Sequence, residues 1–399
     1  MDILIVAHFI NLPNENGNNR FNYLADVLAN ENQEDSVEVI TSSFSHMKKV
    51  QRNDLSGSEN INYKISLCFE PGYPKNVCLR RFYSHYIFGR SLKKYLENRK
   101  KPDVIYCAVP SLDAAYIAMK FAKKNGIRFI IDIQDLWPEA FQMVFRVPVI
   151  SDMIFFPMKW RANQIYSYAD EIVAVSDTYC QRVKSKNKKV NDTHTVFLGT
   201  DLKKFDENVK HNKVQRTDDD IWLGYCGTLG HSYDLKCIID AMAKLSMQGV
   251  SNLKFVVMGD GPLRDSFERY SKESGVNVEF TGRLPYDEMC GRLAACDIAI
   301  NCISKGAAQS IINKHADYAA AGIPVVSTQE CKEYKELVEE YQMGFNCRNN
   351  DSDDLADKIW MLIRDSNLRT NLGKNARICA EEKFDRNLTY KKILQSIDF

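Results

Sequence analysis

The sequence lacks the features that mark several protein classes. It has 53 Lys and Arg against 52 Asp and Glu, a net charge of +1, so no overall positive field favours nucleic acid. No run reaches the roughly 18 apolar residues that span a bilayer, and the most apolar stretch, residues 143–160, is broken by charges and prolines. Residues 1–9 lack the basic region and cleavage site of a signal peptide. We therefore expect a cytoplasmic location and no nucleic-acid partner.

Metal-site and disulfide patterns are also missing. The 12 cysteines include no Cys-x-x-Cys, and no Cys/His pair has zinc-ligand spacing, so the thiols are expected to be buried and reduced. The acidic triplet Asp218–Asp220 lies in the polar segment 203–220 and is interpreted as solvated linker rather than as a metal site. We expect no metal and no cofactor.

Short apolar runs alternate with amphipathic helical patterns along the chain. Ile3–Val6, a helix from Arg20 and the run Val37–Ile40 form a Rossmann-like β-α-β opening, although the Gly-x-Gly-x-x-Gly fingerprint is absent. The same alternation resumes at Ile221–Cys226, after the linker. With 399 residues, the chain is predicted to form α/β domains, each with a parallel sheet covered by helices.

The stretch from Lys305 to Thr328 reads as a loop, a helix and a strand that follow a buried strand. A helix that begins at the carboxyl end of a parallel strand favours an anion. Lys314 and Asp317 lie three residues apart on one helical face, where they would suit a phosphate and a ribose diol. The alternative is an ordinary crossover with a surface ion pair.

Two further clusters indicate a site. Glycines in Gly227–Gly230 follow a buried strand and would let backbone amides approach a phosphate. In the first half, Asp132, Asp135 and Glu139 crowd the carboxyl end of a strand, where open sheets bind ligands. Asp135 is interpreted as a general base or, alternatively, as a cap of the helix opened by Trp137.

Residues 80–101 combine eight Lys or Arg with one acid and several aromatic side chains. Such a helix can lie on an anionic membrane surface, or it can pack its apolar side on the domain and leave its charges in water.

These segments resemble the family 4 retaining glycosyltransferases, and among them the enzymes of bacterial surface polysaccharide synthesis. The family pattern is a Glu, seven residues, a second Glu and small residues that end in Gly-x-Pro-Val. Gln309 and Asp317 take the places of the two acids, Gly322 begins the matching ending, and Lys314 matches a lysine common in that branch. Residues 131–141 resemble the branch's Asp-Leu-Trp-Pro-Glu signature.

The resemblance implies the GT-B architecture, in which two Rossmann-like parallel-sheet domains face a cleft. Residues 1–200 would bind the acceptor, residues 201–375 would bind the nucleotide sugar, and a helix in residues 376–399 would cross back onto the first domain. The implied reaction is retaining, metal-independent transfer of a hexosyl or N-acetylhexosaminyl group from a UDP-sugar to a glycan or polyprenyl-diphosphate-linked sugar. The alternatives are a non-catalytic nucleotide-sugar-binding subunit and a nucleotide-sugar epimerase.

The resemblance also assigns roles to residues. The catalytic candidates are Asp135 and Gln309, and the loop that borders the acceptor contributes Gly17, Asn18 and Arg20, together with Trp137; Gly17 alternatively serves only a turn. The family usually has an Arg where Thr228 stands, so Lys314 is expected to neutralise the diphosphate. The donor-binding candidates are Gly227, Thr228, Gly259, Arg283, Leu284, Ile311, Ile312, Asn313, Lys314 and Asp317.

Overall fold

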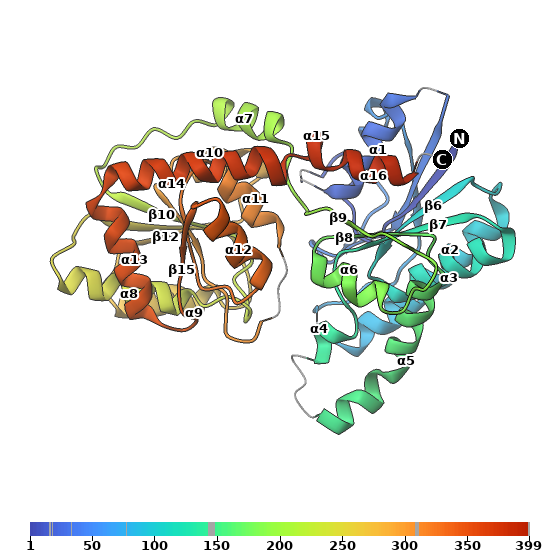
Figure 1. Cartoon of the computed structure of the whole chain (residues 1–399), viewed down its shortest axis with the longest axis horizontal. Coiled ribbons are helices and arrows are strands. Elements are labelled where there is room, and N and C mark those ends of the chain that lie inside the picture. The colour runs from blue at the N-terminus through green and yellow to red at the C-terminus, as the bar shows by residue number, and fades with distance from the viewer. Residues whose placement is uncertain are drawn as a thin grey trace. The chain divides into compact units, whose positions relative to one another are not determined.

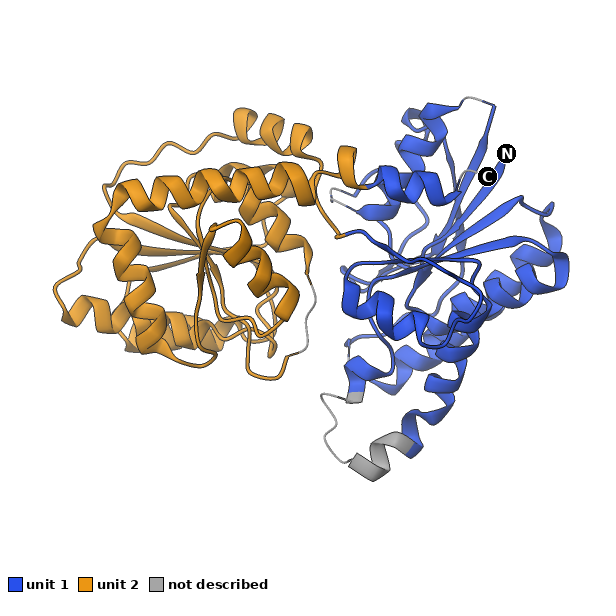
Figure 2. Ribbon diagram, viewed as in Figure 1, with its two compact units in different colours: residues 1–196, 390–399 blue, residues 197–389 orange. Residues whose placement is uncertain are grey.

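The computed structural model describes the chain except for residues 16, 18, 33, 77, 143–147, 308–310 and 398–399 and the side chains of 142 and 148–152. The chain divides into two compact units (Figure 2). Unit 1 comprises Met1–Val196 together with Tyr390–Phe399, and unit 2 comprises Phe197–Thr389. Within the described residues, no helix is both long and apolar enough to cross a bilayer.

Unit 1 contains a seven-stranded parallel sheet with the order β5-β2-β1-β6-β7-β8-β9 (Figure 1). Along β1, Ile3 and Ile5 join the core on one face, whereas Leu4 and Val6 join the core on the other, as the two-residue period of a strand requires. A doubly covered strand must be apolar at every position, which explains the run Ile3–Val6. The strands are β1 Asp2–Val6, β2 Ser36–Ser42, β5 Lys64–Cys68, β6 Val104–Val109, β7 Arg128–Ile133, β8 Glu171–Ala174 and β9 His194–Thr195, and Phe44–Ser45 (β3) pairs with Val50–Gln51 (β4) in a separate antiparallel ribbon.

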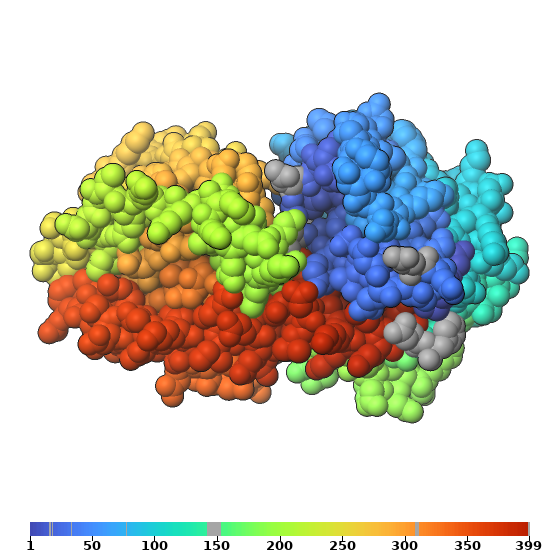
Figure 3. Space-filling view, turned by 90° about the horizontal axis from the view of Figure 1, so that it is seen from above, coloured from blue at the N-terminus to red at the C-terminus, as the bar shows by residue number. Residues whose placement is uncertain are grey.

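Helices cover both faces of this sheet. Phe88 of α2 and Ala115 of α3 belong to one core, and Leu24 of α1 belongs to the other. Residues 390–397 complete the second core, because Ile393 and Ile397 of α16 pack there; Figure 3 shows these red residues beside blue ones. The helices are α1 Arg20–Glu31, η1 Ser58–Asn60, α2 Leu79–Asn98, α3 Leu112–Asn125, α4 Glu139–Gln142, α5 Pro148–Tyr168, α6 Asp177–Lys184 and α16 Lys391–Ile397.

Unit 2 contains a six-stranded parallel sheet with the order β12-β11-β10-β13-β14-β15. Again the core is double, with Leu223 of the central strand β10 on one face and Trp222 on the other. The strands are β10 Ile221–Cys226, β11 Leu253–Met258, β12 Val278–Gly282, β13 Ile298–Asn301, β14 Val325–Ser327 and β15 Gly344–Asn346. The helices are α7 Leu202–His211, α8 Leu235–Met247, α9 Arg264–Glu273, α10 Tyr286–Ala294, α11 Asn313–Ala320, α12 Lys332–Glu340, α13 Ser352–Arg364, α14 Ser366–Cys379 and α15 Arg386–Thr389.

The predicted α/β class with two parallel sheets is confirmed. The interpretation of residues 203–220 as linker is wrong in its first half, where α7 forms. Asp201 caps this helix by accepting from the Lys204 amide, and Leu202 and Phe205 are buried on one face. The C-terminal region expected as one helix is instead divided among α14, a π-helical turn at Ala380–Phe384, α15 and α16.

Candidate functional site

The ammonium group of Lys314 is buried in unit 2, and no described residue provides a counter-ion for it. The side chain is 7% exposed, and its Nζ lies 4.3 Å from the ring centre of Tyr225 and 3.8 Å from that of Tyr233. It has no hydrogen-bond partner within the described residues. Burial lowers the pKa of Lys314 to about 7. A buried cation that only aromatic faces surround is costly unless an anion joins it.

Helix α11 holds this lysine against the end of β10. Four residues after Lys314, and hence on the same helical face, Tyr318 accepts the amide of Cys226 at 3.2 Å and donates to the carbonyl of Ile300 at 3.1 Å. A Cβ at Gly227 would lie 3.2 Å from the Lys314 Nζ, so the ammonium lies beside the glycine backbone. The structure thus brings the predicted lysine and the predicted glycine loop together.

The glycines are required by close backbone approach. Gly227 has φ +140°, and a Cβ at Gly259 would lie only 1.8 Å from the Gly227 carbonyl oxygen. Gly259 also bridges to Gly282, which places exposed Arg283 and half-buried Leu284 after the same strand end. Thr228 is exposed, and its carbonyl accepts from the Tyr225 hydroxyl at 2.8 Å. These residues border a loop in which the amides of Gly227 and Leu229 already donate to the carbonyls of Met258 and Asp260, each at 2.9 Å.

The start of α11, where an anion was expected to bind, has one backbone amide that is already occupied. The Ile312 amide donates to Nδ1 of His315 at 3.2 Å, so it is already occupied. Burial lowers the pKa of His315 and keeps this nitrogen an acceptor. Ile311 is buried and Asn313 is exposed. The role predicted for the Ile312 amide is therefore wrong in this structure, because a buried histidine three residues ahead takes its hydrogen bond.

Asp317 does not share a partner with Lys314. It is 6% exposed and accepts from the Tyr286 hydroxyl at 2.8 Å; this hydroxyl also lies 2.8 Å from Oγ1 of Thr200. Burial raises the pKa of Asp317 to about 6. The alternative of a surface ion pair is wrong, because both side chains are buried and they contact different residues.

In unit 1, the acidic cluster after β7 separates into three environments. Asp132 pairs with Arg20 at 2.7 Å, and Glu139 pairs with Arg182 at 2.6 Å. Asp135 accepts the amide of Leu136 at 2.9 Å and the Trp137 indole N–H at 3.1 Å. Burial raises the pKa of Asp135. Because α4 begins at Glu139 and both of these donors precede it, Asp135 is a half-buried acid held by Trp137 rather than a helix cap.

The residues predicted to contact an acceptor fare differently. Arg20 is 2% exposed and also donates to the carbonyl of Val196 at 2.9 Å, so the expectation that it faces an acceptor is wrong: an arginine this deep pairs with Asp132 instead. A Cβ at Gly17 would lie 2.6 Å from the side-chain amide of Asn11. The predicted residues Asn18 and Gln309 lie outside the described part of the chain.

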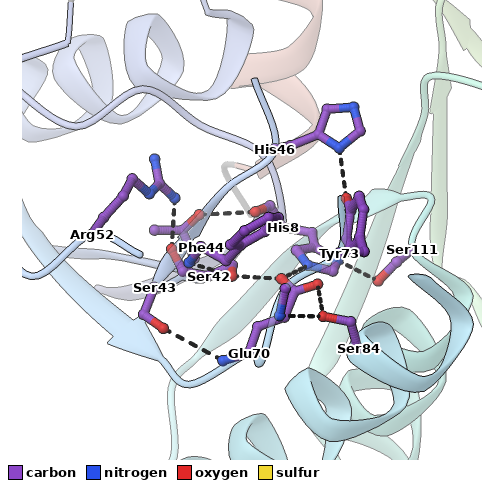
Figure 4. A network of polar contacts seen from close by, with 12 residues as sticks. His8, Ser42, Ser43, Phe44, His46, Arg52, Glu70, Tyr73, Ser84 and Ser111 are labelled. Carbon is purple, nitrogen blue, oxygen red and sulfur yellow. Dashed lines mark hydrogen bonds and ion pairs between the residues drawn. The ribbon is translucent and has the colours of Figure 1, made fainter. Parts of the chain in front are cut away.

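The structure also gathers three residues that the sequence analysis missed. Ligand atoms of His8, Glu70 and His85 lie within 4.8 Å of one another, all buried. Nε2 of His8 donates to Glu70 at 2.7 Å, and the Ser84 hydroxyl donates to the other carboxylate oxygen at 2.7 Å (Figure 4). His8 and Glu70 each come two residues after a buried parallel strand, β1 and β5. That placement at the carboxyl ends of strands was the available signal.

Comparison with known proteins relates the chain to glycosyltransferases. Residues 206–378 match the family described as Glycosyl transferases group 1. The chain is 28% identical over 244 residues to "Probable glycosyltransferase WbjE" of Pseudomonas aeruginosa, and the aligned part is 58% of each protein. It is 24% identical over 271 residues, or 65% of this chain and 71% of the relative, to a Campylobacter jejuni protein named "GalNAc-alpha-(1->4)-GalNAc-alpha-(1->3)-diNAcBac-PP-undecaprenol alpha-1,4-N-acetyl-D-galactosaminyltransferase". The chain thus spans less than two thirds of the first of these relatives.

Solved structures share the fold. The Anabaena protein HepE in complex with UDP matches with a TM-score of 0.71 at 15% identity, over 100% of this chain and 99% of that one. WaaG, a glycosyltransferase involved in lipopolysaccharide biosynthesis, matches with a TM-score of 0.66 at 13% identity, over 98% of both chains. The two parallel sheets therefore belong to the GT-B type of α/β fold.

Proposed function

We propose that the chain transfers a hexosyl or N-acetylhexosaminyl group, with retention, from a UDP-sugar to a glycan or lipid-linked oligosaccharide in surface polysaccharide synthesis. The observation that carries this proposal is the unpaired buried ammonium of Lys314 beside the Gly227 backbone. A diphosphate would supply the missing negative charge beside the lysine. The similarity to HepE, whose structure is a complex with UDP, supports the same ligand class.

The proposed chemistry needs a positive charge that stabilises the leaving group and a carboxylate that serves the acceptor. When the bond from the anomeric carbon to the phosphate oxygen breaks, negative charge grows on the departing diphosphate, where Lys314 would stabilise it. The acceptor oxygen bonds to the same carbon and loses its proton. Asp135, whose pKa is raised by burial, would take that proton or stabilise positive charge on the sugar ring. Because the positive charge of Lys314 would balance the negative charge of the diphosphate, we propose that neither a divalent metal nor another cofactor takes part.

One observation favours a second candidate, a non-catalytic subunit that binds a nucleotide sugar. Thr228 is exposed at the position where the family usually has an arginine. Lys314 alone would then face the diphosphate, which suffices for binding but weakens leaving-group stabilisation. Turnover with any donor and acceptor would exclude this candidate, and conversion of the donor to an isomer without acceptor would indicate an epimerase.

We further propose that unit 1 attaches to an anionic membrane at the cytoplasmic face. Exposed large apolar side chains gather on α2 and α5, and Phe141 links these helices by ring contacts with Phe82 at 5.6 Å and Phe155 at 6.0 Å. Lysines beside an exposed apolar surface suit anionic lipid. The apolar residues are Leu79, Phe82, Tyr83 and Tyr86 on α2 and Met153, Ile154, Phe156 and Trp160 on α5.

The test of the donor site is a screen of nucleotide sugars with the purified chain, in which hydrolysis is measured without acceptor and transfer with candidate acceptors. We expect one UDP-sugar to be turned over, and Lys314→Met to weaken its binding by about 10- to 100-fold, the value of a charge-assisted hydrogen bond. Lys305→Met, at an exposed lysine before the same helix, is the matched control. Unchanged affinity in Lys314→Met would reject the site.

A further inference from the structure

A second group of cationic side chains surrounds the Tyr73 ring in unit 1. Lys49 Nζ lies 4.6 Å from the ring centre, and the guanidinium carbon of Arg81 lies 5.6 Å from it. Nδ1 of His46 lies 2.6 Å from the Tyr73 hydroxyl, and the His85 ring centre lies 5.7 Å from that of Tyr73. Figure 4 draws the contact between His46 and Tyr73 as a dashed line. These groups come from the segment after β3, the segment after β5 and the first turns of α2.

Within the described residues neither Lys49 nor Arg81 forms an ion pair, although the carboxylates of Glu70 and Asp135 are near enough to raise the pKa of Arg81. Lys49 donates to the side-chain oxygen of Asn76 at 2.5 Å, and Arg81 donates to the Asn76 carbonyl at 2.9 Å, both uncharged. Nε of Arg81 is buried without a partner, and so is Nε2 of His85, a side chain only 2% exposed. A buried polar atom without a partner is costly in a folded protein, so a ligand that supplies hydrogen bonds to these two atoms would be favoured.

The electrostatics of the cluster agree. Burial lowers the pKa of Arg81, and burial together with the Arg81 charge lowers the pKa of Lys49. Burial and the neighbouring cations lower the pKa of His46 to about 3. The pKa of His85 is also lowered by burial and by His8, Arg81, His46 and Lys49. An anion placed among these groups would raise each pKa and stabilise the charged forms.

A metal ion held by His8, Glu70 and His85 is the rival interpretation. It is disfavoured because Glu70 is already saturated: one oxygen accepts from His8 and from the Ser42 hydroxyl at 2.6 Å, and the other accepts from Ser84. The nearby charges of Arg81 and Lys49 would also repel a cation. The same charges attract an anion.

We propose that Arg81, Lys49, His46 and His85 form a binding site for the phosphate or diphosphate group of the acceptor. This inference rests on the proposed glycosyl transfer and names its acceptor as a phosphorylated sugar. The Arg81 guanidinium lies 5.0 Å from the Trp137 ring, and the Trp137 indole donates to Asp135. The proposed base therefore lies close to the phosphate site, so the reacting hydroxyl belongs to a sugar near the phosphorylated end rather than to the far end of a long glycan.

The first experiment measures binding of inorganic pyrophosphate to the full chain by calorimetry, with UDP present to occupy unit 2. We expect Arg81→Gln and Lys49→Gln each to weaken pyrophosphate binding at least tenfold. Arg90→Gln, an exposed arginine on the same helix, is the matched control and should bind as the unaltered chain does. Circular dichroism and melting show whether each variant is folded, and Lys49→Gln serves if Arg81→Gln is not. Unchanged binding in both variants overturns the proposal.

The second experiment identifies the source of the phosphate. Transfer is measured to a soluble sugar phosphate, to a short-chain lipid-diphosphate sugar and to the same sugar as an alkyl glycoside without phosphate. In Lys49→Gln the KM should rise for a phosphorylated acceptor and stay unchanged for the alkyl glycoside. Whether the KM rises for the sugar phosphate or for the lipid-diphosphate sugar shows which of the two carries the phosphate that binds here. An equal rise for all three rejects the phosphate role. Zinc binding that disappears in His85→Ala would replace the proposal with the metal site.

The two proposals can fail separately. If Lys49→Gln loses pyrophosphate while no nucleotide sugar is turned over, the anion site stands and glycosyl transfer does not. If turnover occurs and pyrophosphate binds equally to every variant, transfer stands and the anion site does not.

Discussion

At the scale of single residues, the buried ammonium of Lys314 lowers the free energy of unfolding and favours the binding of an anionic ligand. Its ammonium is enclosed by Tyr225 and Tyr233 and lacks a counter-ion among the described residues, so charging it in the empty protein is unfavourable. Removing such a charge often stabilises a protein while function is lost. The sequence located this lysine because its position before a small-residue helix resembles a known pattern.

The titration of Lys314 predicts how donor affinity depends on pH. Its pKa is lowered to about 7 in the free protein, and a bound diphosphate would raise it, so binding above pH 7 must take up a proton. Affinity for the UDP-sugar should be constant below about pH 7 and then fall by up to about tenfold per pH unit. Calorimetry in buffers of different ionisation enthalpy measures this uptake. An affinity that does not change between pH 7 and pH 9 contradicts the assigned pKa.

Asp135 carries the second residue-scale prediction. Asp135→Asn keeps the shape of the side chain and one of its two acceptor oxygens but removes the negative charge. Turnover should therefore fall by about 10²-fold, the usual scale of general acid–base catalysis. Donor affinity should stay unchanged, and the melting temperature should fall slightly, because the amide nitrogen of Asn cannot accept one of the two hydrogen bonds that the carboxylate accepts. Asp192→Asn, at an exposed position of the same unit, is the control. Near-normal turnover in Asp135→Asn, measured with a verified acceptor, means that Asp135 only positions Trp137.

Other residue assignments could not be made from sequence because their partners are distant in the chain. Arg20 was expected beside an acceptor, yet its partner Asp132 lies 112 positions away. His8 meets Glu70 only because β1 and β5 end at the same edge of one sheet. The local sequence pattern predicts where a strand ends, but it does not predict which buried charged side chains pair with each other at that end.

At the scale of elements, α2 illustrates how a charge count misleads. Two arginines of the basic stretch 80–101 already have partners inside the protein. Arg81 contacts aromatic rings and Arg99 pairs with Asp2 and Glu38, so neither is available to a membrane. Conversely, α7 was missed because the helix has only two buried residues, Leu202 and Phe205, within a polar segment. Strands were predicted more reliably, since a strand buried on both faces must be a continuous apolar run.

The membrane prediction belongs to α2 and α5. Reversal of Lys93, Lys94, Lys100 and Lys101 to Glu should reduce sedimentation with anionic vesicles, and Trp160→Ser should reduce the binding that remains at high salt, because the first removes charge and the second removes apolar contact. Reversal of three exposed lysines of unit 2, Lys203, Lys204 and Lys210, is the control. Equal binding to neutral and anionic vesicles would reject the electrostatic part.

At the scale of the whole molecule, we predict that transfer survives chelation. EDTA should leave the rate unchanged within error, since Lys314 is proposed to stabilise the diphosphate. The rate is measured before and after dialysis against the chelator, with Mg²⁺ and Mn²⁺ added back. A lost rate that either ion restores would show that the lysine does not suffice. The architecture itself was predictable, because alternating strands and helices admit few parallel-sheet folds.

Unit 1 is discontinuous in sequence, and this has a consequence for how the protein is made. Residues 390–397 leave the ribosome only after all of unit 2, yet Tyr390, Ile393 and Ile397 fill the core over α1, and the Arg20 guanidinium lies 4.8 Å from the Tyr390 ring. Until those residues are synthesised, the apolar side chains that they cover on one face of the unit 1 sheet are exposed to solvent. If translation stops within unit 2, unit 1 would therefore expose apolar surface to chaperones and proteases, even though nearly all of unit 1 had already been translated.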